Sequence, residues 1–379
     1  MIYLDNAATT WPKPPQVLHA MTECIEIFGA NPGRSGYKMA LEAGSLLLYT
    51  REMLSTFFKV DDPFRFIYTL NCTDSLNLAI KGLLKPGHHV ITTGMEHNSV
   101  VRPLMHLKSQ GVEISFIKCS GSGMVDPDDI KRAIKGNTRL IVTTHASNVT
   151  GTIMPIDHIG NIAKSYGITY LVDAAQTVGC LPIDLSSLPV DLVAMPGHKG
   201  LRGPQGTGVL YIGPGAEPVQ LREGGTGSQS EIPYQPNIRP DRYESGTMNT
   251  PGIAGLGAGI KYILDCGQDK LVNKEKKLEK FFIEALLHLD KVKLYGPRDL
   301  GARVGVISIN IGDIASSQAA DILDQKYGIA VRGGLHCAPM AHRTIGTLKQ
   351  GTVRISFGSF NTIDQVKYCI RAIDEISRM

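Results

Sequence analysis

The stretch Ile168-Thr-Tyr-Leu-Val-Asp173-Ala-Ala-Gln176 decides the fold class of this chain. It is a short apolar run that follows a helical segment ending at Gly167, and it leads directly into a carboxylate. Similar apolar runs recur from residue 65 to 212 and alternate with segments of helical period. Strands that are apolar throughout are typical of a mainly parallel sheet covered by helices on both faces. The sequence therefore predicts an α/β fold.

Outward from this stretch, the same reasoning predicts strands at 65–69, 89–93, 113–118, 139–144, 168–172, 191–195 and 208–212. Helices are expected at 73–84, 98–109 and 157–166, and another begins at Asp126. Residues 213–245 are rich in Gly, Pro and polar side chains, and we expect an extended loop or hairpin there. Helices at 252–265 and 270–289 follow. A smaller α+β unit completes the chain, with strands at 304–311, 329–332 and 352–357 and helices at 316–327 and 362–377.

Composition excludes several classes of protein. The 379 residues carry a net charge of +4, and the densest charged run, Lys274-Glu-Lys-Lys277, alternates in sign, which favours a solvated helix face over a nucleic-acid surface. The seven cysteines are odd in number and form no CxxC pair, so neither a disulfide framework nor a metal site is expected. The first residues, Met1-Ile-Tyr-Leu-Asp5, lack a basic segment followed by an apolar one, and no apolar run is long enough for a membrane span. We therefore expect a cytoplasmic protein with reduced thiols.

Two polar residues lie where an α/β sheet places its ligands, after the ends of strands. Asp173 follows one strand, and Lys199 follows the next in the string Pro196-Gly-His-Lys-Gly200. An acid and an amine that converge on one ligand suit pyridoxal phosphate, because its aldehyde forms a Schiff base with Lys and its pyridine nitrogen needs a carboxylate. Taken singly, each residue could instead be a helix cap or a solvated side chain.

Two further strings follow strands and precede helices. Asn71-Cys72-Thr73 could bind a phosphate at a helix N-terminus, or Thr73 could simply cap the helix. His97, in Met95-Glu96-His97-Asn98, could stack on a planar cofactor ring or cap the next helix.

Together these strings resemble the cysteine desulfurases of the class V aminotransferase superfamily, which are fold-type I pyridoxal phosphate enzymes. The matching strings run in family order and include Tyr3-Leu-Asp-Asn-Ala-Ala-Thr-Thr10, His145-Ala-Ser-Asn-Val-Thr-Gly151, Tyr243-Glu-Ser-Gly-Thr247-Met-Asn-Thr250, Arg332-Gly-Gly-Leu-His-Cys337 and Arg354-Ile-Ser-Phe-Gly-Ser-Phe-Asn-Thr362. The resemblance implies a large cofactor-binding domain, residues 15–250, around a mainly parallel seven-stranded sheet. It implies a small α+β domain, residues 1–14 and 251–379, that carries the loop of the catalytic cysteine.

The resemblance also implies residue roles. The residues implied to be catalytic are Lys199, which holds the cofactor and moves the substrate α-proton, Cys337, and His97, which stacks on the cofactor ring. Those implied to bind the cofactor are Cys72, Thr73, His97, Asn148, Asp173, Gln176, His198, Lys199 and Thr247. Those implied to hold the substrate are Asn148, Arg332 and Arg354. Because Thr247 reaches the phosphate of a neighbouring subunit in this family, a homodimer is implied.

Cys337 decides the expected reaction. A lone cysteine is more often a small buried apolar side chain, but the match to the family's cysteine string implies a nucleophile that takes sulfur from L-cysteine as a persulfide and leaves L-alanine. The adjacent His336 could help to ionise the thiol, and the persulfide would pass to a sulfur-acceptor protein, as in iron–sulfur cluster assembly. Alternatives left open are a selenocysteine lyase, an aminotransferase or epimerase of the same fold, and a non-catalytic protein. Pro196 and Cys72 depart from the family's usual Ser and Thr.

Overall fold

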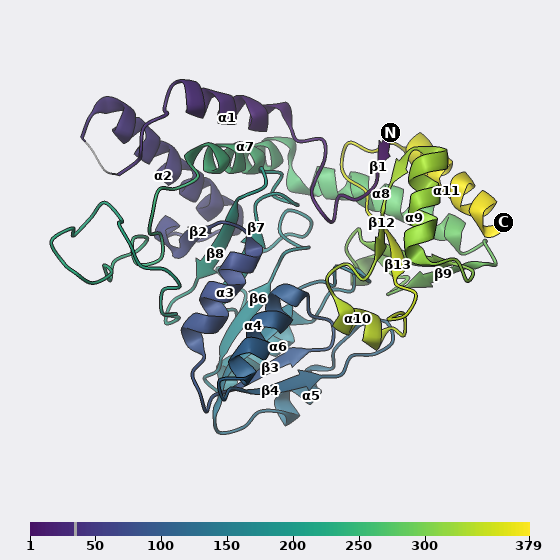
Figure 1. Ribbon diagram of the computed structural model, residues 1–379, viewed down its shortest axis with the longest axis horizontal. Coiled ribbons are helices and arrows are strands. Elements are labelled where there is room, and N and C mark those ends of the chain that lie inside the picture. The colour runs from purple at the N-terminus through teal and green to yellow at the C-terminus, as the bar shows by residue number, and fades with distance from the viewer. Residues whose placement is uncertain (34–35) are drawn as a thin grey trace.

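The apolar runs around Asp173 form one seven-stranded sheet in the computed structural model, which describes residues 1–33 and 36–379 (Figure 1). The strands are, in spatial order, β2 (Phe66–Thr69), β8 (Gly208–Ile212), β7 (Leu192–Pro196), β6 (Thr169–Asp173), β5 (Thr138–Thr144), β3 (His89–Thr93) and β4 (Glu113–Ile117). Only β8 runs antiparallel to its neighbours β2 and β7, and all the other pairs are parallel. The predicted mainly parallel seven-stranded sheet is confirmed.

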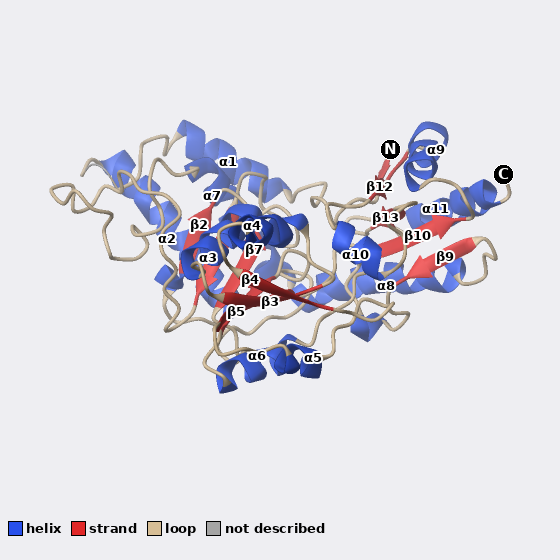
Figure 2. Cartoon of the chain, turned by 60° about the horizontal axis from the view of Figure 1, so that its bottom comes forward, coloured by secondary structure: helices blue, strands red, loops and turns tan. Residues whose placement is uncertain are grey.

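Helices cover both faces of this sheet, because successive strand side chains point to opposite sides. Leu171 faces the core with α3 (Cys72–Leu83) and α4 (Asn98–Lys108), whereas Tyr170 and Val172 face the opposite core. That second core contains residues of α2 (Lys38–Phe58), α5 (Pro127–Arg132), α6 (Ile156–Ser165) and α7 (Thr250–Cys266). Figure 2 shows α3 and α4 on one side of the sheet and α5 and α6 on the other.

A second, antiparallel sheet carries the rest of the predicted site. Its order is β12 (Arg332–Gly334), β13 (Thr352–Ile355), β10 (Ile307–Ile311) and β9 (Val292–Tyr295). Its core contains residues of α8 (Gln268–Leu286), α9 (Ser316–Tyr327) and α11 (Ile363–Ser377). The N-terminus lies here too: β1 (Ile2–Tyr3) pairs with β11 (Ile329–Ala330), and Leu4 is buried in the same core. By contrast, α1 (Pro15–Glu26) packs on α7. The chain thus crosses from one sheet to the other within its first fifteen residues.

The structure corrects some of the sequence-based elements. The strand expected at 304–311 is shorter, because Val304 donates its backbone N–H to Gly151 and so ties this part of the chain to a turn of the large sheet. The sequence analysis missed β9 and α10 (Pro339–Thr344), which have only four and six residues, and also the longer N-terminal helices α1 and α2, which have 12 and 21. Residues 213–249 contain neither helix nor strand, which agrees with the predicted loop.

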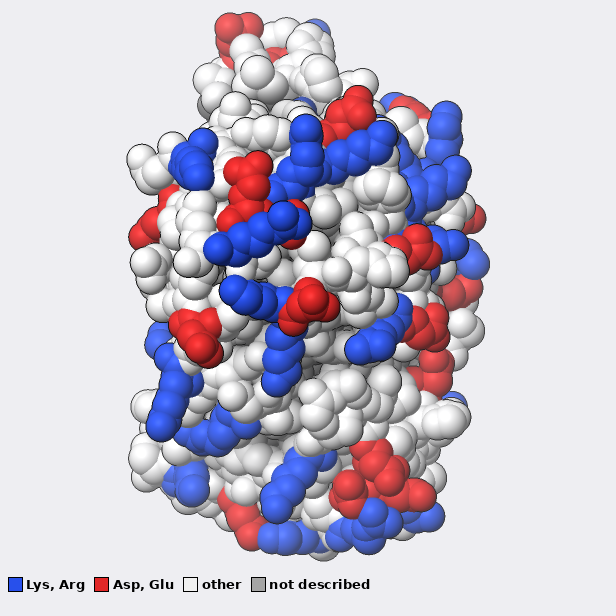
Figure 3. All heavy atoms as spheres, turned by 90° about the vertical axis from the view of Figure 1, so that its right-hand side faces the viewer, with Lys and Arg blue, Asp and Glu red and all other residues white. Residues whose placement is uncertain are grey.

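Charged side chains of both signs are interspersed over the end of the molecule that carries the second sheet (Figure 3). None of the helices in residues 1–33 and 36–379 is long and apolar enough to cross a membrane.

Candidate active site

Asp173 and Lys199 lie at adjacent strand ends, because β6 ends at Asp173 and β7 ends three residues before Lys199. Asp173 is 2% exposed, and its carboxylate accepts a hydrogen bond from the Ala175 N–H at 3.0 Å and one from the Cys72 thiol at 3.7 Å. Burial raises the pKa of Asp173. Burial and the charge of Arg354 lower the pKa of Lys199, against the opposing effects of Cys72 and Asp173. The structure therefore brings a buried acid and a partly buried amine together.

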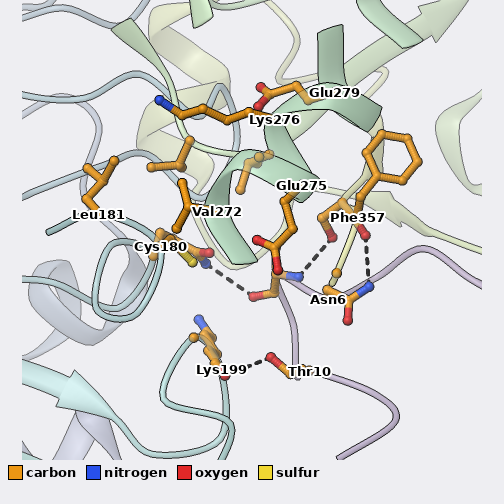
Figure 4. Close-up of a pocket in the computed structure, with 18 of the residues that line it drawn as sticks. Asn6, Thr10, Cys180, Leu181, Lys199, Val272, Glu275, Lys276, Glu279 and Phe357 are labelled. Carbon is orange, nitrogen blue, oxygen red and sulfur yellow. Dashed lines mark hydrogen bonds between the residues drawn. The ribbon is translucent and has the colours of Figure 1, made fainter. Parts of the chain in front are cut away.

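The backbone around Lys199 is held on several sides. Its carbonyl accepts hydrogen bonds from Thr10 Oγ1 at 2.7 Å and from the Arg202 N–H at 2.8 Å (Figure 4). The next residue must be Gly200, because an added Cβ would come within 2.0 Å of the Val178 carbonyl oxygen. This close packing fixes where the Lys199 side chain begins.

The N-terminal segment crosses the site beside this turn. Thr9 Oγ1, the Thr10 N–H and Lys13 Nζ all donate to the His198 carbonyl, at 3.2, 3.1 and 2.7 Å. Figure 4 shows Asn6 and Thr10 on this segment beside a cavity of about 60 Å³ that Lys199, Cys180 and Glu275 also line. Lys13 was not singled out from the sequence; burial lowers its pKa to about 8.

The beginning of α3 leaves its first turn beside the predicted site with Asn71 as the cap. Asn71, not Thr73, caps the helix: its side chain accepts the N–H of Asp74 at 3.0 Å. Thr73 is therefore not used as the cap, and it lies exposed in the first turn, where the helix dipole favours an anion. The buried Nδ1 of His198, next to Lys199, has no hydrogen-bond partner in the described parts of the chain.

His97 caps α4, as the structural alternative predicted. Its Nδ1 accepts the Ser99 N–H at 3.1 Å and contacts Ser99 Oγ at 2.7 Å. Burial, followed by the charges of Lys199 and Arg332, lowers the pKa of His97 to about 4, so the ring is neutral. A neutral ring held in one orientation remains suited to stacking, and the cap does not exclude that role.

The cysteine loop places its thiol at the surface. Cys337 is exposed and lines a cavity of about 350 Å³ together with His97 and Thr73. Both His336 and Cys337 have positive φ angles, 52° and 57°, which is strained for residues with side chains. Two hydrogen bonds of 2.8 Å hold this geometry: Asn148 Nδ2 donates to the His336 carbonyl, and the Asn98 N–H donates to the Cys337 carbonyl.

The cationic neighbour of the thiol is Arg332, not His336. Arg332 Nη2 donates to Cys337 Sγ at 3.5 Å. His336 is 2% exposed, and its Nε2 lies 3.1 Å from the Thr352 carbonyl oxygen. Burial lowers the pKa of His336 to about 2, with a further contribution from Arg354. The structure does not support the suggestion that His336 helps to ionise the thiol, because Nε2 is taken up at Thr352 and no hydrogen bond joins either ring nitrogen to Cys337 Sγ in the described residues.

Arg354 lies in β13, directly opposite Arg332 in the ladder with β12. Its Nη2 is 2.6 Å from Asp5 Oδ1, and its Nη1 donates to the Asn148 carbonyl at 3.2 Å. The sequence analysis quoted Asp5 as part of a matching string but gave it no role; its 349-residue separation from Arg354 leaves no local signal of the pair.

Two of the residues predicted to bind the cofactor, Gln176 and Thr247, form no hydrogen bond with Asp173 or Lys199 in the described parts of the chain. Gln176 is buried and donates to the Ala7 carbonyl at 3.2 Å. Thr247 is exposed in the 213–249 loop, where its Oγ1 lies 3.5 Å from Asn31 Nδ2. Within residues 1–33 and 36–379, Thr247 forms no hydrogen bond with the residues around Lys199.

Comparison with known proteins gives the family. The model of the family described as "Aminotransferase class-V" matches residues 2–369. The chain belongs to the aminotransferase class-V family. A probable cysteine desulfurase of Methanothermobacter thermautotrophicus is 35% identical to this class-V chain over 100% of the chain and 95% of the relative. A probable cysteine desulfurase of Pyrococcus abyssi is 37% identical over 99% of this chain and 94% of the relative.

A solved structure agrees with this placement. The apo structure of cysteine desulfurase from Thermococcus onnurineus NA1 is similar to the class-V chain with a TM-score of 0.90 and 33% identity, over 100% of this chain and 94% of the other. These findings confirm the predicted family resemblance and the fold that it implies. In residues 1–33 and 36–379, no group of three or more His, Cys, Asp or Glu side chains is arranged to hold a metal ion.

Proposed function

We propose that this class-V chain is a cysteine desulfurase that uses pyridoxal phosphate to convert L-cysteine to L-alanine and keeps the sulfur as a persulfide on Cys337. One observation carries the proposal: a partly buried lysine with a buried carboxylate, and an exposed thiol beside a guanidinium, lie around the same site. An aminotransferase needs the first pair but has no use for the second. The named relatives, which are cysteine desulfurases or probable ones, support the same choice.

The residues present suit pyridoxal phosphate. Asp173 is a buried carboxylate whose protein partners are one N–H and one thiol, which leaves it able to meet a pyridine nitrogen. His198 Nδ1, buried without a partner, and the first turn of α3 with Thr73 would meet the phosphate. Lys199 would hold the aldehyde, while His97, Asn148 and Gln176 would border the ring. When bound, the cofactor supplies an electron sink that weakens the substrate's bonds at Cα and Cβ.

The chain's own residues would transfer the substrate proton and bind the substrate carboxylate. Because burial lowers the pKa of Lys199, its Nζ is the group placed to accept and return the substrate α-proton. Arg354 and Asn148 would orient the substrate carboxylate, since a guanidinium binds a carboxylate through two parallel hydrogen bonds. The neutral His97 ring adds no positive charge beside Lys199.

Cys337 takes the sulfur. Its Sγ attacks the substrate sulfur; the new S–S bond forms as the Cβ–S bond breaks, and Cβ takes a proton. L-cysteine and the Cys337 thiol thus become L-alanine and a Cys337 persulfide, with atoms and electrons balanced. The Arg332 guanidinium, 3.5 Å from Sγ, would stabilise negative charge on sulfur during both attack and discharge.

The oligomeric state, the sulfur acceptor, the location and the domain division are also proposals. We infer a homodimer, because Thr247 is exposed and the family resemblance implies that it reaches a neighbouring subunit. Large apolar side chains also remain exposed on α1, α2 and the 213–249 loop, among them Leu18, Ile25, Leu41 and Tyr234. A thiol-bearing acceptor protein would take the persulfide sulfur. The seven free cysteines support a reducing, cytoplasmic location. We also propose a large domain and a small domain, with one change from the expected bounds of 15–250 and of 1–14 with 251–379. Because Ile253, Leu256 and Ile260 of α7 lie in the core of the large sheet, α7 belongs with the large domain.

The test is to load the protein with pyridoxal phosphate, add L-cysteine and a reductant, and quantify alanine. We expect alanine together with a persulfide on Cys337 that mass spectrometry detects, and no alanine from Cys337→Ala. Cys266→Ala, a substitution away from the site, serves as the matched control and should keep full activity. If cofactor-loaded protein makes no alanine from cysteine, the proposal fails.

A further inference from the structure

The carboxylate site at Arg354 is already filled by a carboxylate of the chain itself. Arg354 is 1% exposed, so its guanidinium has no free path to solvent. Asp5 Oδ1 holds Nη2 at 2.6 Å, and the Asn148 carbonyl holds Nη1 at 3.2 Å. Among the described residues the buried Nε of Arg354 has no hydrogen-bond partner, whereas Nη2 is held by Asp5. A substrate carboxylate that binds through the Nε and Nη2 edge therefore competes with Asp5 for Nη2.

Asp5 is the partner that can leave. The Asn148 carbonyl belongs to a buried stretch of backbone, whereas the Asp5 side chain is 19% exposed at the edge of the N-terminal segment. Rotation of one carboxylate into water costs less than movement of a buried peptide, because the released charge regains its hydration.

The charges around Asp5 favour such an exchange. Arg332 and Arg354 are paired directly across the β12–β13 ladder, and the charge of Arg332 acts on Arg354, whereas Asp5 forms an ion pair with Arg354. A substrate carboxylate that replaces Asp5 brings the same charge, so the exchange leaves Arg354 paired throughout. Asp5 thus offsets the repulsion between the two arginines while the site is free.

We propose that Asp5 is a resident counter-ion that the α-carboxylate of the amino-acid substrate displaces from Arg354, and that it thereby sets how tightly the site binds carboxylates. This inference rests on the proposed function, because it takes an amino acid as the substrate. The affinity for the substrate then depends on the difference between two free energies: that of the substrate carboxylate bound to Arg354 and that of Asp5 bound to Arg354. Weakly binding anions do not displace Asp5, whereas an amino acid that is also held through its amine does.

The first test compares inhibitors of the cofactor-loaded enzyme. With Asp5→Asn, L-alanine should bind roughly three- to tenfold more tightly, because it no longer competes with a resident ion, whereas L-alaninamide, which lacks the carboxylate, should bind as before. Asp61→Asn, at an exposed position, is the control. If Asp5→Asn weakens alanine binding, Asp5 holds Arg354 in place for the substrate, and the proposal is overturned.

The second test needs neither cofactor nor turnover. Acetate should raise the melting temperature of the apo Asp5→Asn chain more than that of the unaltered chain, and Arg354→Gln added to this variant should abolish the difference. Equal stabilisation of both chains by acetate would refute the displacement. Should Asp5→Asn fail to fold, Asp5→Ser serves in the same pair of measurements. Because the acetate result is independent of alanine formation, failure here is distinguishable from failure of the proposed desulfurase activity.

Discussion

The two halves of the site are built in different ways. The residues around Lys199 come from consecutive strand ends of one parallel sheet, where β6 and β7 lie side by side and place Asp173 and Lys199 near each other. The residues around Cys337 come from an antiparallel sheet, a strained loop and the N-terminal segment, and long-range contacts such as Asp5–Arg354 and Asn148–His336 hold them. The first half is suited to holding a cofactor and a proton, and the second to handling a carboxylate and a sulfur atom.

This difference explains what the sequence could predict. Strand ends of a parallel sheet converge by topology alone, so the apolar runs before Asp173 and Lys199 were enough to place the pair. The Cys337 half depends on which distant segments meet. Sequence adjacency suggested His336 as the partner of the thiol, yet the left-handed backbone at His336 and Cys337 accompanies an imidazole bonded at Thr352 and a thiol bonded by Arg332. Lys13 and Asp5 were missed for the same reason.

The largest expected effect lies in the Lys199 half. Lys199→Ala should lower alanine formation from L-cysteine about a thousandfold, because it removes the group that carries the α-proton. The exchange of the α-proton with deuterated solvent, followed by mass spectrometry, should fall equally. Lys108→Ala, an exposed lysine on α4, should change neither rate. If Lys199→Ala still exchanged the α-proton at the original rate, the proposal that Lys199 transfers this proton would be contradicted.

A smaller effect separates the two halves. Arg332→Gln should slow sulfur transfer to Cys337 about tenfold, because a charge-assisted hydrogen bond to sulfur is lost. The rate of α-proton exchange should stay unchanged, since Lys199 is untouched. Persulfide formation measured by rapid quench and mass spectrometry gives the first rate, and Arg343→Gln on α10 is the control. Equal loss of both rates would show that Arg332 does not act on sulfur alone.

The last effect is on stability and not on a rate, and it belongs to the Lys199 half. Glu96 is buried beside His97, and burial raises its pKa to about 8. A carboxyl whose folded-state pKa lies above its unfolded value stabilises the fold below the unfolded pKa, and this contribution is lost as the pH rises towards about 8. Stability should therefore fall by up to about 1.4 kcal/mol per pH unit across this window.

Glu96→Gln should remove this pH dependence. Denaturant titrations at about pH 6 and about pH 8 would give the free energies of unfolding. Between the two pH values the free energy of unfolding of the variant should fall less than that of the unaltered chain. Glu231→Gln, at an exposed position, should follow the unaltered chain. A pH slope that is the same with and without Glu96 would show that another group causes it.

The most direct measurement of the two-half account uses Cys337→Ser loaded with pyridoxal phosphate. Its two readouts are exchange of the α-proton of L-alanine in deuterated water and formation of alanine from L-cysteine. The account predicts that exchange continues at the rate of the unaltered protein while alanine formation is lost. If the variant still forms alanine from cysteine, or if it loses exchange as well, the separation of proton transfer at Lys199 from sulfur capture at Cys337 is contradicted.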